Sequence, residues 1–215
     1  VRAFADGAEF ASATFTTTNL GVEYLQGASG QFVLPNFPRA GNDVTVRWSE
    51  PHQNFVIVGA SQKSARAEPT GAAPLASSLA NLESPRQGSF ESGIGLIRGW
   101  ICEARTVEIQ IDGGARQRVA YGTTREDTAA TCGDTDNGFG DTFNWNRLGN
   151  GNHTVRAFAD GAEFANVTFA VTTLGVEYLQ GASGEYPLTN FPQPGKNVTV
   201  RWSEPHQNFV IVGYQ

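Results

Sequence analysis

The segment VTVRWSEPHQNFVIV occurs at residues 44–58 and again, letter for letter, at residues 198–212. In both places the apolar residues of VTVRW alternate with polar ones, as on a half-buried β-strand, and NFVIV is the expected partner strand. The repeat extends beyond this segment. Residues 1–59 align with residues 155–213 at a constant offset of 154, and 13 of the 59 aligned positions differ, so 59 − 13 = 46 are identical. A repeat at this spacing predicts a tandem array of modules.

The phase of the repeat divides the chain into four expected parts. They are the C-terminal part of a preceding repeat module (1–59), a linker (60–82), a central β region (83–173) and a small β sub-unit that completes the module (174–213). The linker is rich in Ala, Ser and Pro and lacks aromatic residues, so we expect it to be extended or mobile. Leu75, Leu79 and Leu82 are spaced like one face of a helix, which leaves a short docking helix open as an alternative.

The pattern from residue 83 onward predicts an all-β fold. The expected strands of the central region lie at 96–102, 106–112, 118–121, 142–146, 153–159 and 162–172, and those of the sub-unit at 176–179, 198–202 and 208–212. Asp112-Gly113 and Asp160-Gly161 are hairpin turn signals. Strands about every ten residues with Gly-rich turns are typical of a sandwich or barrel.

The composition excludes several classes of protein. The net charge is −6 and the pI is about 5.1, with no basic patch of the kind that nucleic-acid binding requires. No apolar run approaches the roughly 18–20 residues that span a bilayer. The chain contains no Met and opens with Val1, so we expect that it does not begin at a native translation start and that any signal peptide lies outside it.

The only two cysteines, Cys102 and Cys132, lie in the central region. An acidic repeat array of this kind favours an extracellular setting and therefore a disulfide, and two free buried thiols are the alternative. A loop of this size, closed by a disulfide, would stabilise the fold by about 3–4 kcal/mol in the chain-entropy model. No CxxC spacing is present, which argues against zinc or thioredoxin-type chemistry.

A search for catalytic or metal-binding patterns yields one candidate. Four Asp or Asn side chains surround two glycines in the segment Asp134–Asp141, and Ca²⁺ prefers six to eight hard oxygen ligands. The candidate calcium ligands are Asp134, Asp136, Asn137 and Asp141. The spacing is not that of an EF-hand loop, and the alternative is an Asx-rich turn held by side-chain to backbone hydrogen bonds. No other cofactor is indicated.

The remaining chemistry-bearing residues have structural interpretations. His52 and His206 occupy the same position of the repeat and, like His153, are interpreted as turn or core histidines. The four Trp residues could stack on sugars, but each lies in an expected alternating strand, which favours the core. They are Trp48, Trp100, Trp145 and Trp202. No nucleophile elbow, phosphate loop or dinucleotide fingerprint occurs, so we do not expect an enzyme.

Residues 86–172 carry a series of short motifs in a fixed order. They are Gly99-Trp100-Ile101-Cys102, VEIQIDG at 107–113, YGTTRED at 121–127, Gly138-Phe139 and GNHTV at 151–155. This order resembles bacterial immunoglobulin-like modules of secreted and cell-surface proteins. The resemblance implies that residues 83–173 form an immunoglobulin-like β-sandwich without an active site of its own. Residues 174–213 fall outside the resemblance.

These observations together give an expected function. Residues 1–59 alone would be strands with open edges and half a core, so another segment must complete them. A strand that crosses from one unit to the next gives a head-to-tail contact that does not close and builds a fibre. We therefore expect a structural repeat module of an extracellular bacterial surface filament or adhesin stalk, whose partners are copies of itself or neighbouring repeats. The alternative is a non-catalytic module of a secreted protein that binds carbohydrate or another surface ligand.

Overall fold

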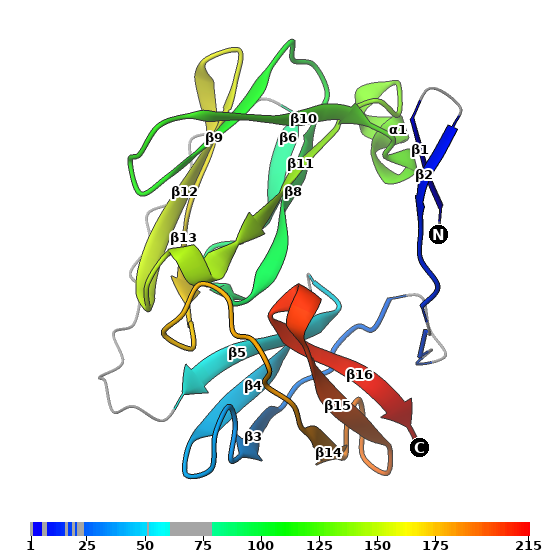
Figure 1. The fold of residues 1–215 in the computed structure, drawn as a ribbon. Helices are drawn as coiled ribbons and strands as arrows, with labels where there is room; N and C mark the ends of the chain where they lie inside the picture. Colours follow the sequence, from blue (N-terminus) through cyan, green and yellow to red (C-terminus); the bar gives the residue numbers. More distant parts are fainter. Residues whose placement is uncertain are drawn as a thin grey trace.

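The computed structural model describes residues 2–5, 8–15, 17–18, 20, 24–50, 52–60 and 79–215 (Figure 1). The fold is all-β: strands dominate, and the described residues contain one short α-helix, α1 (Ala129–Cys132). Of the linker expected at 60–82, residues 61–78 lie outside the described residues. Strand β6 (Ala80–Ser84) begins within the range expected for the linker, because Leu82 is buried in a strand that pairs with β8 (Ile94–Ile101). Leu82 is therefore not part of a docking helix.

Residues 80–173, called the large body below, form an eight-stranded sheet. Its order is β6-β8-β11-β10-β9-β12-β13-β7, with β7 at Phe90–Glu91, β9 at Val107–Ile111, β10 at Gln117–Thr123, β11 at Gly138–Asn144, β12 at Gly151–Ala159 and β13 at Ala162–Val171. All neighbours are antiparallel except β13 and β7, which are parallel. Buried residues alternate with less buried ones along β8 and β9, and Ile97 and Ile101 from one half of the sheet meet Val107 and Ile109 from the other in a single core.

Two Asp-Gly turns connect strands of the large body. Asp112 and Asp160 have φ values of 50° and 48°, and the glycines that follow them have φ values of 69° and 86°. Two successive residues with positive φ are the requirement of the tight hairpin turn that the sequence predicts at both places.

The two copies of the repeat form two three-stranded sheets of the same order. The first contains β3 (Gln31–Pro35), β4 (Asp43–Ser49) and β5 (Asn54–Ala60), and the second contains β14 (Glu185–Thr189), β15 (Asn197–Ser203) and β16 (Asn208–Tyr214). Their registers are the same after the offset of 154, including an irregularity after Thr45 and Thr199. The two sheets pack against each other (Figure 1). Residues 24–60 and 174–214, which contain them, are called the small body below.

A separate hairpin, β1 (Arg2–Ala5) and β2 (Ala8–Ser12), lies at the N-terminal side (Figure 1). It repeats the register of β12 and β13: Ala3 opposes Ala11 as Ala157 opposes Ala165, and the irregularity that follows falls at the same place. The same sequence therefore forms the same hairpin in two surroundings.

Two expected strand positions are wrong. Residues 176–179 form bends, because the backbone of Leu179 pairs with a side chain: its N–H donates to Gln207 Oε1 (2.5 Å) and its C=O accepts from Gln207 Nε2 (3.1 Å). Gln53 holds Leu25 in the same way in the first copy. Trp145, expected at the end of a strand, instead opens the short 3₁₀-helix η2 (Trp145–Arg147).

Candidate functional site

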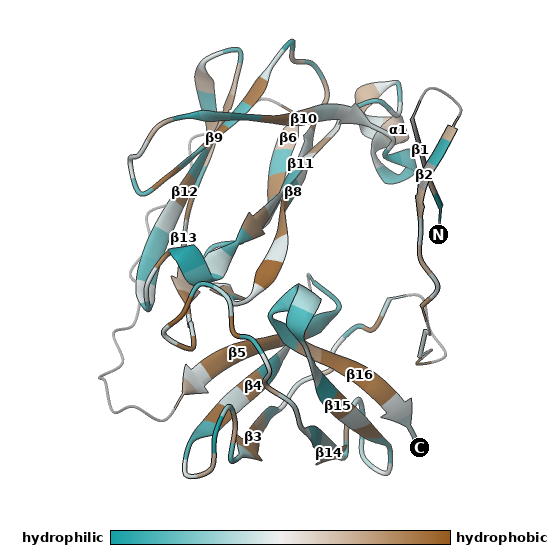
Figure 2. Cartoon of the chain, viewed as in Figure 1, coloured by the Kyte–Doolittle hydropathy of each residue, from teal (hydrophilic) through white to brown (hydrophobic). Residues whose placement is uncertain are grey.

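The most extensive feature of the chain that involves both copies is the core of the small body. Apolar residues of the first copy and their equivalents in the second form one cluster, and both sheets carry hydrophobic residues along their strands (Figure 2). The equivalent buried pairs are Leu34 and Leu188, Phe37 and Phe191, Val44 and Val198, Val46 and Val200, Trp48 and Trp202, and Phe55 and Phe209. A three-stranded sheet with one apolar face is marginal alone, so each sheet depends on the other for burial.

Aromatic contacts in this core obey a pseudo-two-fold relation. Phe37 lies 4.9 Å from Trp202, and its equivalent Phe191 lies 5.2 Å from Trp48, measured between ring centroids. The contact of Phe191 with Phe32 (5.9 Å) likewise matches that of Phe37 with Tyr186 (6.4 Å). Such reciprocity is the mark of an isologous interface, in which one surface patch recognises its own copy. Here both patches belong to one chain.

The first copy also contacts the large body through a buried polar cluster. His52 Nδ1 lies 2.6 Å from Ser49 Oγ, and His52 Nε2 lies 2.7 Å from Ser84 Oγ and 3.1 Å from Glu91 Oε2. Glu91 is 1% exposed and also accepts a hydrogen bond from Ser89 Oγ (2.7 Å). The carboxylate is thus partnered although it is buried, as such groups must be.

This cluster does not have the geometry of a catalytic triad. Ser84 and Glu91 contact the same nitrogen of His52, whereas in a triad the nucleophile and the acid contact opposite ring nitrogens. Ser49 does contact the opposite nitrogen, but it is buried, at 8% exposure. Ser84 is also fully buried and donates to the carbonyl of Leu96 (2.9 Å), which leaves no access for a substrate. The arrangement is suited to holding two bodies together.

Two further contacts fix the edge of the first copy. The N–H of Ile57 on β5 donates to Ser92 Oγ (2.8 Å), and the guanidinium of Arg47 lies 4.4 Å from the ring centre of Phe90. His206, the equivalent of His52 in the second copy, contacts Ser203 (2.7 Å) but is exposed. The two copies therefore differ in how they meet the large body.

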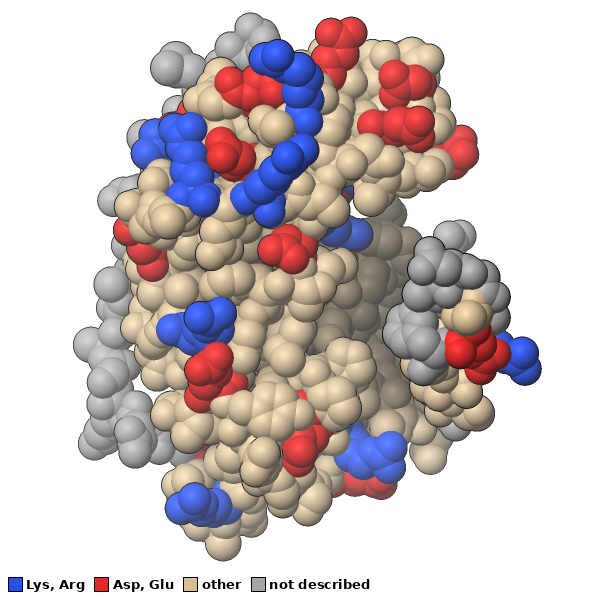
Figure 3. Space-filling view, turned by 45° about the horizontal axis from the view of Figure 1, so that its top comes forward, with Lys and Arg blue, Asp and Glu red and all other residues tan. Residues whose placement is uncertain are grey.

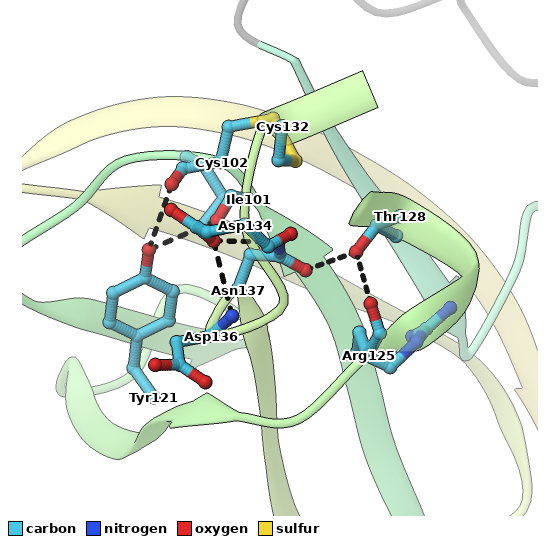
Figure 4. Close-up of a disulfide and its surroundings, with 9 residues drawn as sticks. All are labelled: Ile101, Cys102, Tyr121, Arg125, Thr128, Cys132, Asp134, Asp136 and Asn137. Atoms are coloured by element: carbon cyan, nitrogen blue, oxygen red, sulfur yellow. Dashed lines mark hydrogen bonds between the residues drawn. A yellow bond between two sulfur atoms is a disulfide. The ribbon is translucent and has the colours of Figure 1, made fainter. Parts of the chain in front are cut away.

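A disulfide joins Cys102 and Cys132, and the segment between 125 and 137 is folded over it (Figure 4). Asn137 is fully buried: its amide donates to the backbone carbonyl of Asp134 (3.0 Å) and to Asp134 Oδ1 (3.2 Å), and its Oδ1 accepts from Thr128 Oγ1. Tyr121 Oη donates to the carbonyls of Ile101 (3.0 Å) and Cys102 (3.4 Å), and burial raises the pKa of this tyrosine.

These bonds bear on the candidate calcium ligands. Asp134 Oδ1 also accepts from the N–H of Asp136 (3.1 Å), and Asp141 Oδ1 accepts from the N–H of Thr142 (2.8 Å). Asp134 and Asn137 thus belong to an Asx-type turn. Across the part of the chain that the structure describes, no group of three or more His, Cys, Asp or Glu is placed to hold a metal ion.

His153 lies in strand β12 of the large body and contacts the Asp112 turn. Its Nδ1 lies 2.6 Å from Asp112 Oδ2, and its Nε2 lies 3.1 Å from the carbonyl oxygen of Gly149. Burial opposes ionisation of Asp112, but the N–H of Thr154 and the His153 ring outweigh it and lower the pKa of Asp112. Asp160 is held similarly: burial opposes its ionisation, yet the backbone N–H groups of Thr106 and Arg105 lower its pKa.

The tryptophans divide into two groups. Trp48, Trp145 and Trp202 are at most 5% exposed and belong to the cores, so they offer no platform for a ligand. Trp100 is half-buried on β8, where it alternates with the buried Gly99 and Ile101 and thus faces away from the core.

A polar cavity of about 580 Å³ is the second candidate site. It lies against the outer face of β6, β8 and β11, where Glu83 and Arg98 alternate with buried residues of their strands. Arg125 donates to both carboxylate oxygens of Glu83 (2.9 Å each) and to Asp127 (2.7 and 2.5 Å). The hydrogen bonds to Asp127 and Glu83 raise the pKa of Arg125, and the bond from Arg125 lowers the pKa of Asp127.

Sequence reasoning found the disulfide pair and three of the four core tryptophans, but it was wrong for Trp100 and did not identify Ser84, Glu91 or the walls of the cavity. A Glu in a polar stretch carries no local signal that it will be buried, since its partner His52 is remote in sequence. Arg125 and Asp127 lie within the quoted YGTTRED motif, whereas nothing marks Glu83 as their partner.

No protein-family model, no curated protein and no solved structure matches this chain. Within the described residues, no helix has the length and apolar character required to cross a membrane.

Proposed function

We propose that the chain is a structural repeat module of an extracellular bacterial surface filament or adhesin stalk, and that its large body is an immunoglobulin-like β-sandwich. The observation that carries the proposal is the single core to which both copies of the repeat contribute equivalent residues, such as Phe37 and Phe191. This core joins the end of one module to the equivalent part of the next module along the chain. The Cys102–Cys132 disulfide is compatible with an oxidising extracellular setting.

Strand complementation is the second part of the proposal. Ala157 and Ala165 on β12 and β13 are buried at 0% and 8% exposure, because β12 pairs with β9 and its inner face lies on the core. Their equivalents Ala3 and Ala11 lie on a two-stranded sheet and are partly or fully exposed. The β1–β2 hairpin would thus accept the surroundings that β9 gives to β12, supplied by a neighbouring repeat or by another copy of the chain.

The test is sedimentation and electron microscopy of the purified chain over a range of concentrations. We expect assembly that grows with concentration, and loss of assembly in Ala3→Asp, which places a charge where the equivalent Ala157 is buried. Arg2→Ala is the control, since the side chain of Arg2 is 70% exposed. A dispersed monomer at every concentration would contradict assembly by strand complementation.

The alternative function is a non-catalytic binding module for a surface glycan or similar ligand. The polar cavity beside Arg125 favours it, because its volume falls within the usual range of ligand sites. Both functions are compatible in one protein, since the cavity and the shared core use different residues.

A further inference from the structure

We infer that the polar cavity binds a carboxylate-bearing sugar, such as a uronic acid unit of an acidic glycan. The inference rests on the second of the two proposed functions and names its site and ligand class. The residues that carry it are Tyr24, Glu83, Arg86, Arg98, Arg125 and Asp127, all of which line the cavity. Figure 3 shows a hollow between the body of the molecule and the N-terminal segment, with a Lys or Arg side chain in it.

Gly138, one of the lining residues, is covered by the side chains of Thr123 and Arg125. A Cβ at this position would come within 2.3 Å of Thr123 Oγ1 and 2.9 Å of Arg125 Cγ, so the close approach of β10 and the Arg125 stem requires glycine. The stem of Arg125 therefore packs directly over Gly138, which helps to hold the guanidinium at the cavity.

One wall is rigid. The guanidinium of Arg125 is held between Glu83 and Asp127 by paired hydrogen bonds, which fixes both carboxylates in place. The backbone of Arg125 is fixed as well: its N–H donates to the carbonyl of Thr135 (2.7 Å), and its carbonyl accepts from Thr128 Oγ1 (2.9 Å). Cys132, which forms the disulfide with Cys102, lies between Thr128 and Thr135 in this segment (Figure 4). Carboxylate oxygens preorganised in this way can accept hydrogen bonds from sugar hydroxyls.

Arg86 supplies positive charge at the cavity. Among the described residues, the cavity is lined by three arginines and by two carboxylates, Glu83 and Asp127. Arg125 is satisfied by the two acids, whereas the guanidinium of Arg86 has no partner among the described residues, and Arg86 is exposed. An arginine fork matches a carboxylate in two parallel hydrogen bonds. The unused fork of Arg86 favours an anionic ligand.

Tyr24 provides the apolar contact that a sugar ring needs. Its side chain is 43% exposed, and it comes from the first copy, whereas all other lining residues come from the large body. An amphipathic ring at the edge of a polar site packs on the C–H face of a sugar while its hydroxyl stays solvated. A simple carboxylic acid would contact only Arg86 and would leave Tyr24 and the carboxylates without a ligand contact.

The experiment is a titration of the full chain, by calorimetry or by NMR, with an oligosaccharide of uronic acids and with the neutral oligosaccharide of the same linkage. We expect binding of the acidic sugar that is at least about 10-fold stronger than binding of the neutral one, as a charge-assisted pair predicts. Arg86→Ala should lower the affinity by about 10-fold or more, and Arg86→Lys should restore only part of it, because lysine keeps the charge but not the fork.

Arg147→Ala is the matched control, since Arg147 is 63% exposed, pairs with Glu177 and does not line the cavity. Thermal melting of each variant checks that it is folded, and we expect no change for Arg86→Ala because the residue is exposed. Equal affinity for acidic and neutral sugars, an unchanged affinity in Arg86→Ala, or no binding at millimolar sugar would each overturn the inference. None of these outcomes bears on the array proposal, which is read from particle size and from Ala3→Asp.

Discussion

The ring of Phe37 lies 4.8 Å from the ring of Phe209, although the two residues belong to different copies of the repeat. The equivalent contact, between Phe191 and Phe55, is 4.9 Å. Each copy therefore inserts the same phenylalanine against the same partner of the other copy. Because the exchange is reciprocal, loss of either phenylalanine removes the same kind of contact.

Phe37→Ala and Phe191→Ala should destabilise the chain by similar amounts. Both side chains are 0% exposed, and truncation of a buried phenylalanine costs about 3–5 kcal/mol through lost transfer energy and the remaining cavity. Urea denaturation of each variant measures the loss. Val33→Ala is the control: Val33 lies on the same sheet but is 62% exposed, so its change should stay within about 0.5 kcal/mol. A large effect in only one of the two phenylalanine variants would show that the copies do not share one core.

Removal of the disulfide should weaken the large body. The bond closes a loop with a sequence separation of 30 residues, and the chain-entropy model gives a loss of about 3–4 kcal/mol for Cys102→Ser with Cys132→Ser. Denaturation of the double variant, and of the native chain under reducing conditions, should give the same loss. If neither treatment changes the free energy of unfolding, the disulfide does not stabilise the fold.

The strands of this fold were predictable where apolar and polar residues alternate strongly, as in residues 107–111 and 198–202. A strand with one buried face has apolar side chains at every second position. The same rule predicted a strand at residues 176–179, where the structure has none. The backbone of Leu179 is satisfied by the side chain of Gln207, and no local pattern encodes that exchange. Strand β14, which contains Pro187, was not among the expected strands, and the proline is tolerated there because β14 is an edge strand.

The candidate sites were less predictable than the strands. The cavity wall pairs Arg125 with Glu83, 42 residues away, and the polar cluster pairs His52 with Ser84, 32 residues away. Such partners are set by how whole sheets pack, so they follow from the tertiary fold and not from a motif. The disulfide was accessible because the chain holds only two cysteines, which leaves one intramolecular pairing.

Acid should weaken the large body only at low pH. The folded-state pKa values of Asp112, Asp127 and Asp160 are lowered from the ordinary value of 3.8. A group with a lowered pKa contributes stability that is fully present above the unfolded value, and this is lost as pH falls through the folded value. Stability due to these groups should therefore be constant from neutral pH down to near 3.8 and should decline below it.

Asp112→Asn and Asp160→Asn test this prediction without disturbing the turns. Asparagine tolerates the positive φ of both positions and is favoured before glycine in such turns. Each variant should be less stable than the native chain at neutral pH, and the difference should shrink below pH 3.8 in urea denaturation. A difference that does not depend on pH would mean that the charge of the aspartate plays no part.

His52→Ala and His206→Ala should differ, although the two residues occupy the same position in identical segments. Truncation of His52 leaves the carboxylate of Glu91, 1% exposed, without the ring nitrogen at 3.1 Å, and it also removes a partner from the fully buried Ser84. An unsatisfied buried polar group costs about 1–3 kcal/mol, and more when it is charged. His206 is exposed and contacts Ser203, so its loss should cost no more than about 0.5 kcal/mol. Urea denaturation gives both values, and hydrogen exchange at Glu91 and Ser92 locates the change, since protection there should fall in His52→Ala alone. Equal losses in the two variants would mean that the first copy is not held to the large body through His52.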